Sequence, residues 1–143
     1  MADHLYLTPA HSLQQAFDQA APGTVIHLAK GVYRQKVIIK TPGLTLIGDG
    51  QHNTEIVYDD YANKLDENGV EYNTFRTWTV AVCADHVTMR RLAILNDALQ
   101  PETKGQEVAL SVLGDDFLME DCRLFSTQDT LFAGPLPPDL IER

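Results

Sequence analysis

The sequence has only two cysteines, Cys83 and Cys122, and no apolar run near the roughly 20 residues that cross a membrane. Two cysteines do not make a disulfide framework, and we expect both to be small buried residues of apolar strands. Basic residues are scarce: 11 lysines and arginines stand against 20 aspartates and glutamates, for a formal net charge of -9. Without a positive stripe to contact phosphates, nucleic-acid binding is not expected. Cys-x-x-Cys, His-x-x-x-His and carboxylate-loop patterns are also missing, so the sequence predicts no metal site.

The chain begins Met1-Ala2-Asp3-His4, with no basic region followed by an apolar one, and so shows no secretory signal. We therefore expect either a cytoplasmic protein or one whose leader has been removed. The 143 residues, 44% of them hydrophobic, predict one domain over 1–143 that buries a core.

One helix and a series of short strands are predicted. Over residues 12–21, Ser12 is a suitable N-cap, apolar residues recur at helical spacing, and Pro22-Gly23 follows. Period-two alternation between turn residues then predicts strands over 24–29, 36–40, 44–48, 55–58, 78–84, 87–95, 107–113 and 117–125.

The strands repeat. Val80, Val82, Val87, Met89, Leu92 and Ile94 reappear as Leu110, Val112, Phe117, Met119, Cys122 and Leu124 (110 − 80 = 30). Val37, Ile39, Leu44 and Leu46 anticipate Val80, Val82, Val87 and Met89 (80 − 37 = 43). Strand, tight turn, strand and variable loop, repeated in register, predict an all-β fold, a right-handed parallel β-helix; a β-sandwich is the alternative. We expect helix 12–21 to precede the first strand and cap the solenoid, coils over 24–132, and a loop or tail over 133–143.

Gln128-Asp129 follows the last predicted strand, and Gln106 precedes the strand before it. On stacked coils these positions come close on one face. A carboxylate flanked by two carboxamides suits attack on an ester or amide carbonyl: the amide N–H groups stabilise an oxyanion, and the acid protonates the leaving group. The alternative is structural, because Asp often caps backbone N–H groups at turns.

Five segments, in order, resemble motifs of the pectin methylesterase (pectinesterase) family, β-helical esterases that act on methylated polygalacturonate. They are Gly31-Val32-Tyr33-Arg34-Gln35, where Gln35 replaces the family's usual Glu, Leu44-Thr45-Leu46-Ile47-Gly48-Asp49-Gly50, Thr74-Phe75-Arg76-Thr77-Trp78-Thr79-Val80, Gln106-Glu107-Val108-Ala109-Leu110, and Cys122 to Phe132 with Gln128-Asp129-Thr130-Leu131-Phe132.

The resemblance implies roles for particular residues. Asp129 would be the general acid/base, and Gln106 and Gln128 would supply the oxyanion donors. Thr74 would contact the galacturonate chain, and Phe132 or Phe125 would offer a sugar an apolar face, although Phe125 is equally suited to the lumen. The implied partners are pectin and methylated oligogalacturonides, without membrane or nucleic acid, and no metal or organic cofactor is implied.

The family's nucleophilic aspartate, in a Val-Asp-Phe-Ile-Phe-Gly motif, has no counterpart in this sequence. We therefore expect the chain to be the N-terminal portion of an esterase, truncated and incomplete for catalysis by itself, with self-association through the open end of the β-helix. Two other functions remain: a non-catalytic carbohydrate-binding or structural solenoid, and a pectate lyase, for which the sequence supplies neither a Ca²⁺-binding carboxylate cluster nor a basic abstracting residue.

Overall fold

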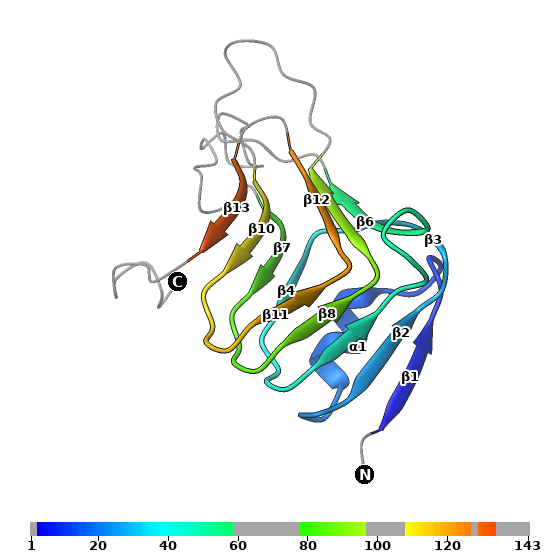
Figure 1. The fold of residues 1–143 in the computed structure, drawn as a ribbon. Helices are drawn as coiled ribbons and strands as arrows, with labels where there is room; N and C mark the ends of the chain where they lie inside the picture. The colour runs from blue at the N-terminus through cyan, green and yellow to red at the C-terminus, as the bar shows by residue number, and fades with distance from the viewer. Residues whose placement is uncertain (1–2, 59–77, 97–107, 127–128, 134–143) are drawn as a thin grey trace, which may run out of the picture.

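The computed structural model describes residues 3–58, 78–96, 108–126 and 129–133, and these form stacked coils of short strands (Figure 1). The elements, in chain order, are β1 (His4–Leu7), α1 (Leu13–Gln19), β2 (Val25–Leu28), β3 (Gly31–Arg34), β4 (Val37–Ile39), β5 (Thr45–Ile47), β6 (Thr54–Tyr58), β7 (Trp78–Val82), β8 (Thr88–Arg90), β9 (Ala93–Asn96), β10 (Val108–Val112), β11 (Leu118–Glu120), β12 (Arg123–Phe125) and β13 (Asp129–Ala133).

The strands form three parallel sheets, ordered β1-β2-β5-β8-β11, β13-β10-β7-β4 and β12-β9-β6-β3. Each strand pairs with the strand one coil away, and the predicted offsets are the observed registers: Leu110 pairs with Val80, and Val80 with Val37. From β2 onward, consecutive strands therefore go to different sheets, which is the arrangement of a parallel β-helix and not of a sandwich. The predicted fold class is confirmed.

Columns of apolar side chains from the three sheets fill the lumen. One column holds Ile26, Leu46 and Met89, and another holds Tyr33, Ile56 and Ile94, all with no exposed surface. Because side chains alternate across a strand, the positions between them face outward. The lumen is thus a continuous hydrophobic core that fixes the register of every coil.

Several predicted boundaries were wrong. Segments 87–95 and 117–125 are each two strands, because Arg91 and Asp121 adopt left-handed backbone conformations (φ 55° and 51°) that turn the chain into the next sheet. Strands β1, β3 and β13 were not predicted, and β1 precedes helix α1, so the helix does not come before the first strand. The proposed divisions at 24, 132 and 133 remain predictions.

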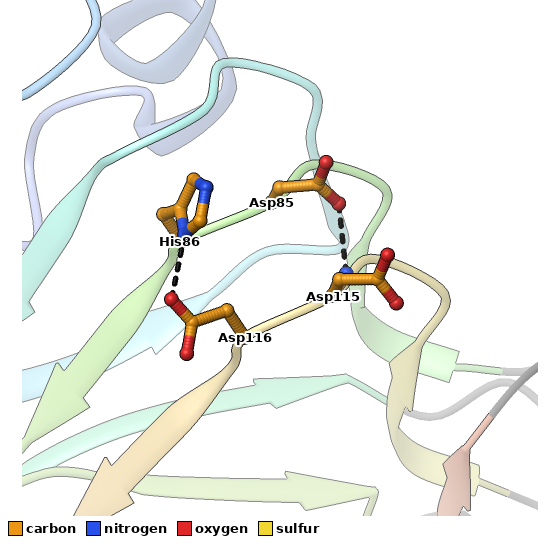
Figure 2. A network of polar contacts seen from close by, with 4 residues as sticks. All are labelled: Asp85, His86, Asp115 and Asp116. Carbon is orange, nitrogen blue, oxygen red and sulfur yellow. Dashed lines mark hydrogen bonds and ion pairs between the residues drawn. The ribbon is translucent and has the colours of Figure 1, made fainter.

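The turn that precedes β8 recurs one coil later before β11, and polar contacts join the two turns (Figure 2). His86 and Asp116, 30 residues apart, both have left-handed φ values of 61° and 59°. His86 Nδ1 lies 2.6 Å from Asp116 Oδ2, and Asp85 Oδ1 accepts a hydrogen bond of 2.8 Å from the Asp115 N–H. These contacts fix the two turns relative to each other, so polar contacts outside the lumen also keep the two coils in register.

Helix α1 covers the free edge of β4, the last strand of its sheet. The Gln14 side chain accepts a hydrogen bond from the Ile38 N–H (2.7 Å) and donates one to the Ile38 carbonyl (2.8 Å), as a neighbouring strand would. The Thr41 hydroxyl donates to the Phe17 carbonyl, and Ser12 caps the helix through the Gln15 N–H. The predicted capping helix is confirmed, and it protects a sheet edge that would otherwise expose unpaired backbone groups.

Gln14→Ala is expected to lower the free energy of unfolding by about 1–2 kcal/mol, because the Ile38 N–H and carbonyl lose their partners. Urea denaturation followed by circular dichroism measures this change. Gln15→Ala is the matched control, since Gln15 is exposed on the same helix and should change stability by less than about 0.5 kcal/mol. Equal losses in the two variants would contradict the role of Gln14.

The cysteines do not follow the prediction. Cys83 is exposed just after β7, whereas Cys122 is half-buried between β11 and β12 and packs against the core. Among the described residues, no helix has the length and apolar character needed to span a bilayer.

Candidate active site

Asp129 is the first residue of β13, where the chain begins its outermost described strand in the β4–β7–β10–β13 sheet. Its backbone is in register with Val108 at the start of β10, and Val108 is in register with Trp78 at the start of β7. The starts of three neighbouring parallel strands therefore meet at one end of this sheet (Figure 1).

In the sequence, the predicted site residues precede or belong to the strands of this sheet. Gln128 immediately precedes β13, Gln106 comes two residues before β10, and Thr74 comes four residues before β7. These three lie outside the described residues, as do the side chains of Asp129 and Phe132. The backbone of Phe132 lies within β13, level with Ser111 of β10. Their roles stay predictions.

Sequence reasoning missed a cation at this end of the sheet. Lys36 directly precedes β4, and its Nζ lies 4.6 Å from the centroid of the Trp78 ring. An ammonium over an indole face is a favourable cation–π contact, and it holds the Trp78 ring at the start of β7. Lys36 stands just before β4, and Trp78 is the first residue of β7, the strand that pairs with β4. The contact therefore follows from the pairing of these strands, which the sequence motif does not reveal.

Phe125 does not pack in the lumen. It ends β12 and remains 47% exposed, while its neighbour Leu124 continues the inward column of Ile56 and Ile94. The alternative of lumen packing for Phe125 is therefore wrong, because the alternation of β12 places Leu124 inward instead.

The quoted motif at residues 31–35 serves the scaffold. The buried Tyr33 donates hydrogen bonds to the carbonyls of Ala29 (2.7 Å) and Leu7 (3.3 Å), and burial raises its pKa to about 12. Gln35 accepts from the Leu13 N–H and donates to the His11 carbonyl (both 2.7 Å), so it ties the start of α1 to the first coil. A carboxylate at this position could accept but not donate, so only the glutamine can make both hydrogen bonds. This explains structurally why the chain has Gln35 here.

Neither of the two cysteine thiols in the described residues is suited to act as a nucleophile. Desolvation by surrounding protein atoms raises the pKa of Cys83 and of Cys122, so neither thiol is activated. Among the described side chains there is also no group of three or more His, Cys, Asp or Glu residues that could hold a metal ion.

Comparisons with known proteins agree with this fold. The Pectinesterase family model matches residues 3–135. Pectinesterase 3 from Solanum lycopersicum is 33% identical over 130 residues, which are 90% of this chain and 22% of that protein. Among solved structures, the pectin methylesterase from Yersinia enterocolitica is 27% identical with a TM-score of 0.79, over 85% of this chain and 43% of that one. A pectin methylesterase in complex with a hexasaccharide is 25% identical, also with a TM-score of 0.79, over 85% of this chain and 41% of that one.

The fold and these matches define a parallel β-helix of the kind found in pectin methylesterases. The chain belongs to the pectinesterase family. It spans less than half the length of the curated relatives and of the solved structures that it matches.

Proposed function

We propose that this chain supplies part of the active site of a pectin methylesterase, which hydrolyses methyl esters of polygalacturonate and releases methanol. The family match over residues 3–135 carries the proposal. The start of β13, where Asp129 lies in register with the starts of β10 and β7, supports the location.

In this proposal Asp129 is the general acid/base. It protonates the departing methanol and then activates the water that hydrolyses the intermediate. The side-chain amides of Gln106 and Gln128 donate hydrogen bonds to the oxyanion. Thr74 and Phe132 contact the galacturonate chain, because they belong to segments that enter or form the same sheet.

The reaction also needs a nucleophile, and the printed sequence has no Val-Asp-Phe-Ile-Phe-Gly segment. We expect a second carboxylate, carried on a further coil stacked beside β13, to form the covalent ester with the galacturonate carbonyl. The solved relatives are more than twice as long as the matched region, which leaves room for such coils.

The test compares methanol release from highly methylated pectin by this chain and by a hybrid. The hybrid joins this chain to the later coils of the Yersinia enterocolitica enzyme. We expect the hybrid to release methanol and this chain by itself to release none. A hybrid that is folded by circular dichroism and releases no methanol would overturn the proposal that residues of this chain complete the site.

A non-catalytic carbohydrate-binding solenoid is the second candidate. The solved complex of a related pectin methylesterase with a hexasaccharide favours an oligosaccharide ligand for this fold. Binding of oligogalacturonides by calorimetry, with no methanol release by the folded hybrid, would favour this candidate.

Self-association through the last described coil is also proposed. Phe117, Met119, Cys122 and Leu124 are only partly buried, whereas Val87, Met89, Leu92 and Ile94, one coil earlier, have no exposed surface. Apolar lumen positions next to β11 and β12, the last described strands of their sheets, favour contact with a second copy.

We expect the sedimentation coefficient of the chain to rise with concentration. Met119→Glu, at a lumen position, should reduce this rise, whereas Leu118→Glu, on the outer face of the same strand, should leave most of it. A concentration-independent monomer would contradict the proposal, and so would equal effects of the two variants when both remain folded.

A further inference from the structure

Two histidines that are 23 residues apart in the sequence meet on the outer face of the first two strands. His4 lies on the edge strand β1 and His27 on β2, and their Nδ1 and Nε2 atoms are 2.9 Å apart. The strand register places them diagonally, because His4 is level with Val25 and His27 is level with Tyr6. This pair lies on a different sheet from Asp129, so the proposed esterase site does not use it.

One of the two rings is held in place from one side. Their planes differ by 18°, with centroids 5.2 Å apart, so one ring donates a hydrogen bond to the other. The Tyr6 ring stacks on His27 with centroids 4.4 Å apart and planes 7° apart. Tyr6 therefore limits rotation of the His27 ring, while His4 stays exposed to solvent and free to turn.

We propose that His4 Nδ1 and His27 Nε2 bind one divalent transition-metal ion, with water filling the remaining positions. Imidazole–metal bonds of about 2.0–2.1 Å with a right angle between them place the two nitrogens about 2.9 Å apart, whereas a tetrahedral angle needs about 3.4 Å. The observed separation therefore suits neighbouring ligands of a square or octahedral ion. Among first-row ions Cu²⁺ binds such nitrogens most tightly, and its tetragonal geometry fits this angle.

Metal binding fixes the tautomer of each ring. When the ion binds, His4 carries its proton on Nε2 and His27 carries its proton on Nδ1, because the two ligating nitrogens must present lone pairs. The ring that donates the hydrogen bond in the metal-free pair therefore changes tautomer when the ion binds. His4 turns about its side-chain bonds so that its lone pair meets that of His27 at the ion.

Metal binding would have a structural effect on the end of the β-helix. Strand β1 pairs only with β2, so it is an edge strand that frays more easily than interior strands. An ion bound to both histidines joins these two strands and stabilises the folded state by mass action, since the unfolded chain does not hold the residues together.

The test is a calorimetric titration of the whole chain with Cu²⁺ in a weakly chelating buffer at pH 7, with Ni²⁺ and Zn²⁺ for comparison. We expect one Cu²⁺ per chain, a higher melting temperature with copper, and an electron paramagnetic resonance spectrum that shows two imidazole nitrogens. His4→Ala and His27→Ala should each weaken binding at least tenfold and remove the melting-temperature shift. His52→Ala is the matched control, because His52 is exposed in the turn between β5 and β6, and it should bind like the unsubstituted chain.

Three results would overturn the proposal. One is no stoichiometric binding. Another is equal loss of affinity in His52→Ala. The third is full retention of copper affinity in His27→Ala, which would assign the copper to His4 together with the amino end of the chain. Circular dichroism of each variant without metal checks that the comparison is between folded proteins.

Discussion

Asp129→Asn is expected to reduce methanol release by the hybrid enzyme by about 10²–10⁴-fold, the usual contribution of a general acid/base. Asparagine nearly matches aspartate in size and can still occupy the first position of β13, but it can neither protonate methanol nor activate water. The Michaelis constant for methylated pectin should change much less than kcat, because the lost step is proton transfer rather than binding. Steady-state methanol assays on purified hybrid give both values.

Asp121→Asn is the control for this experiment. Asp121 lies in the preceding coil, between β11 and β12, and accepts a hydrogen bond of 2.8 Å from Gln51 Nε2. Its φ of 51° is left-handed, which asparagine tolerates as well as aspartate does. Activity should remain near that of the unsubstituted hybrid. If Asp129→Asn kept more than about a tenth of the activity, the acid/base assignment would be wrong, since such catalysis supplies at least about 10²-fold.

The repeat made the fold predictable, because lumen positions of successive coils must align. The 30-residue offset between Val80 and Leu110 is the register of β7 and β10. The corners were less predictable. Arg91 and Asp121 adopt left-handed conformations that usually favour glycine, so their apolar surroundings suggested continuous strands. Contacts from neighbouring coils select these conformations. The alternation of apolar residues along one strand does not reveal such contacts.

The candidate site was predictable in part for the same reason. Motif position points to Gln106, Gln128, Asp129 and Thr74, although the strand that begins at Asp129 was not predicted. The contact of Lys36 with Trp78 depends on the pairing of β4 with β7 across the long segment between them. The pair of His4 and His27 likewise depends on β1, a four-residue strand too short for a clear pattern. Both features come from sheet pairing rather than from spacing along the sequence.

The Leu44–Gly50 motif contains a glycine whose replacement should be costly. A Cβ atom on Gly48 would lie 2.3 Å from the Arg91 carbonyl oxygen and 3.0 Å from the Cβ atoms of Leu92 and Thr54. The Gly48 N–H also donates a 2.8 Å hydrogen bond to the Arg90 carbonyl, so the two coils are held together at this corner. Because the closest atom belongs to the backbone of the next coil, a side chain cannot fit without shifting that coil.

Gly48→Ala should therefore lower the free energy of unfolding by about 3 kcal/mol, through overpacking and weakening of the corner hydrogen bonds. Chemical denaturation measures the loss, and amide hydrogen exchange should show faster exchange at residues 90–92. Thr45→Ala is the matched control: it lies half-buried on the same strand and should cost less than about 1 kcal/mol. A Gly48→Ala chain as stable as the original would mean that the two coils can separate at this corner. In that case the stack would be held mainly by its lumen columns and by the polar turn at His86 and Asp116.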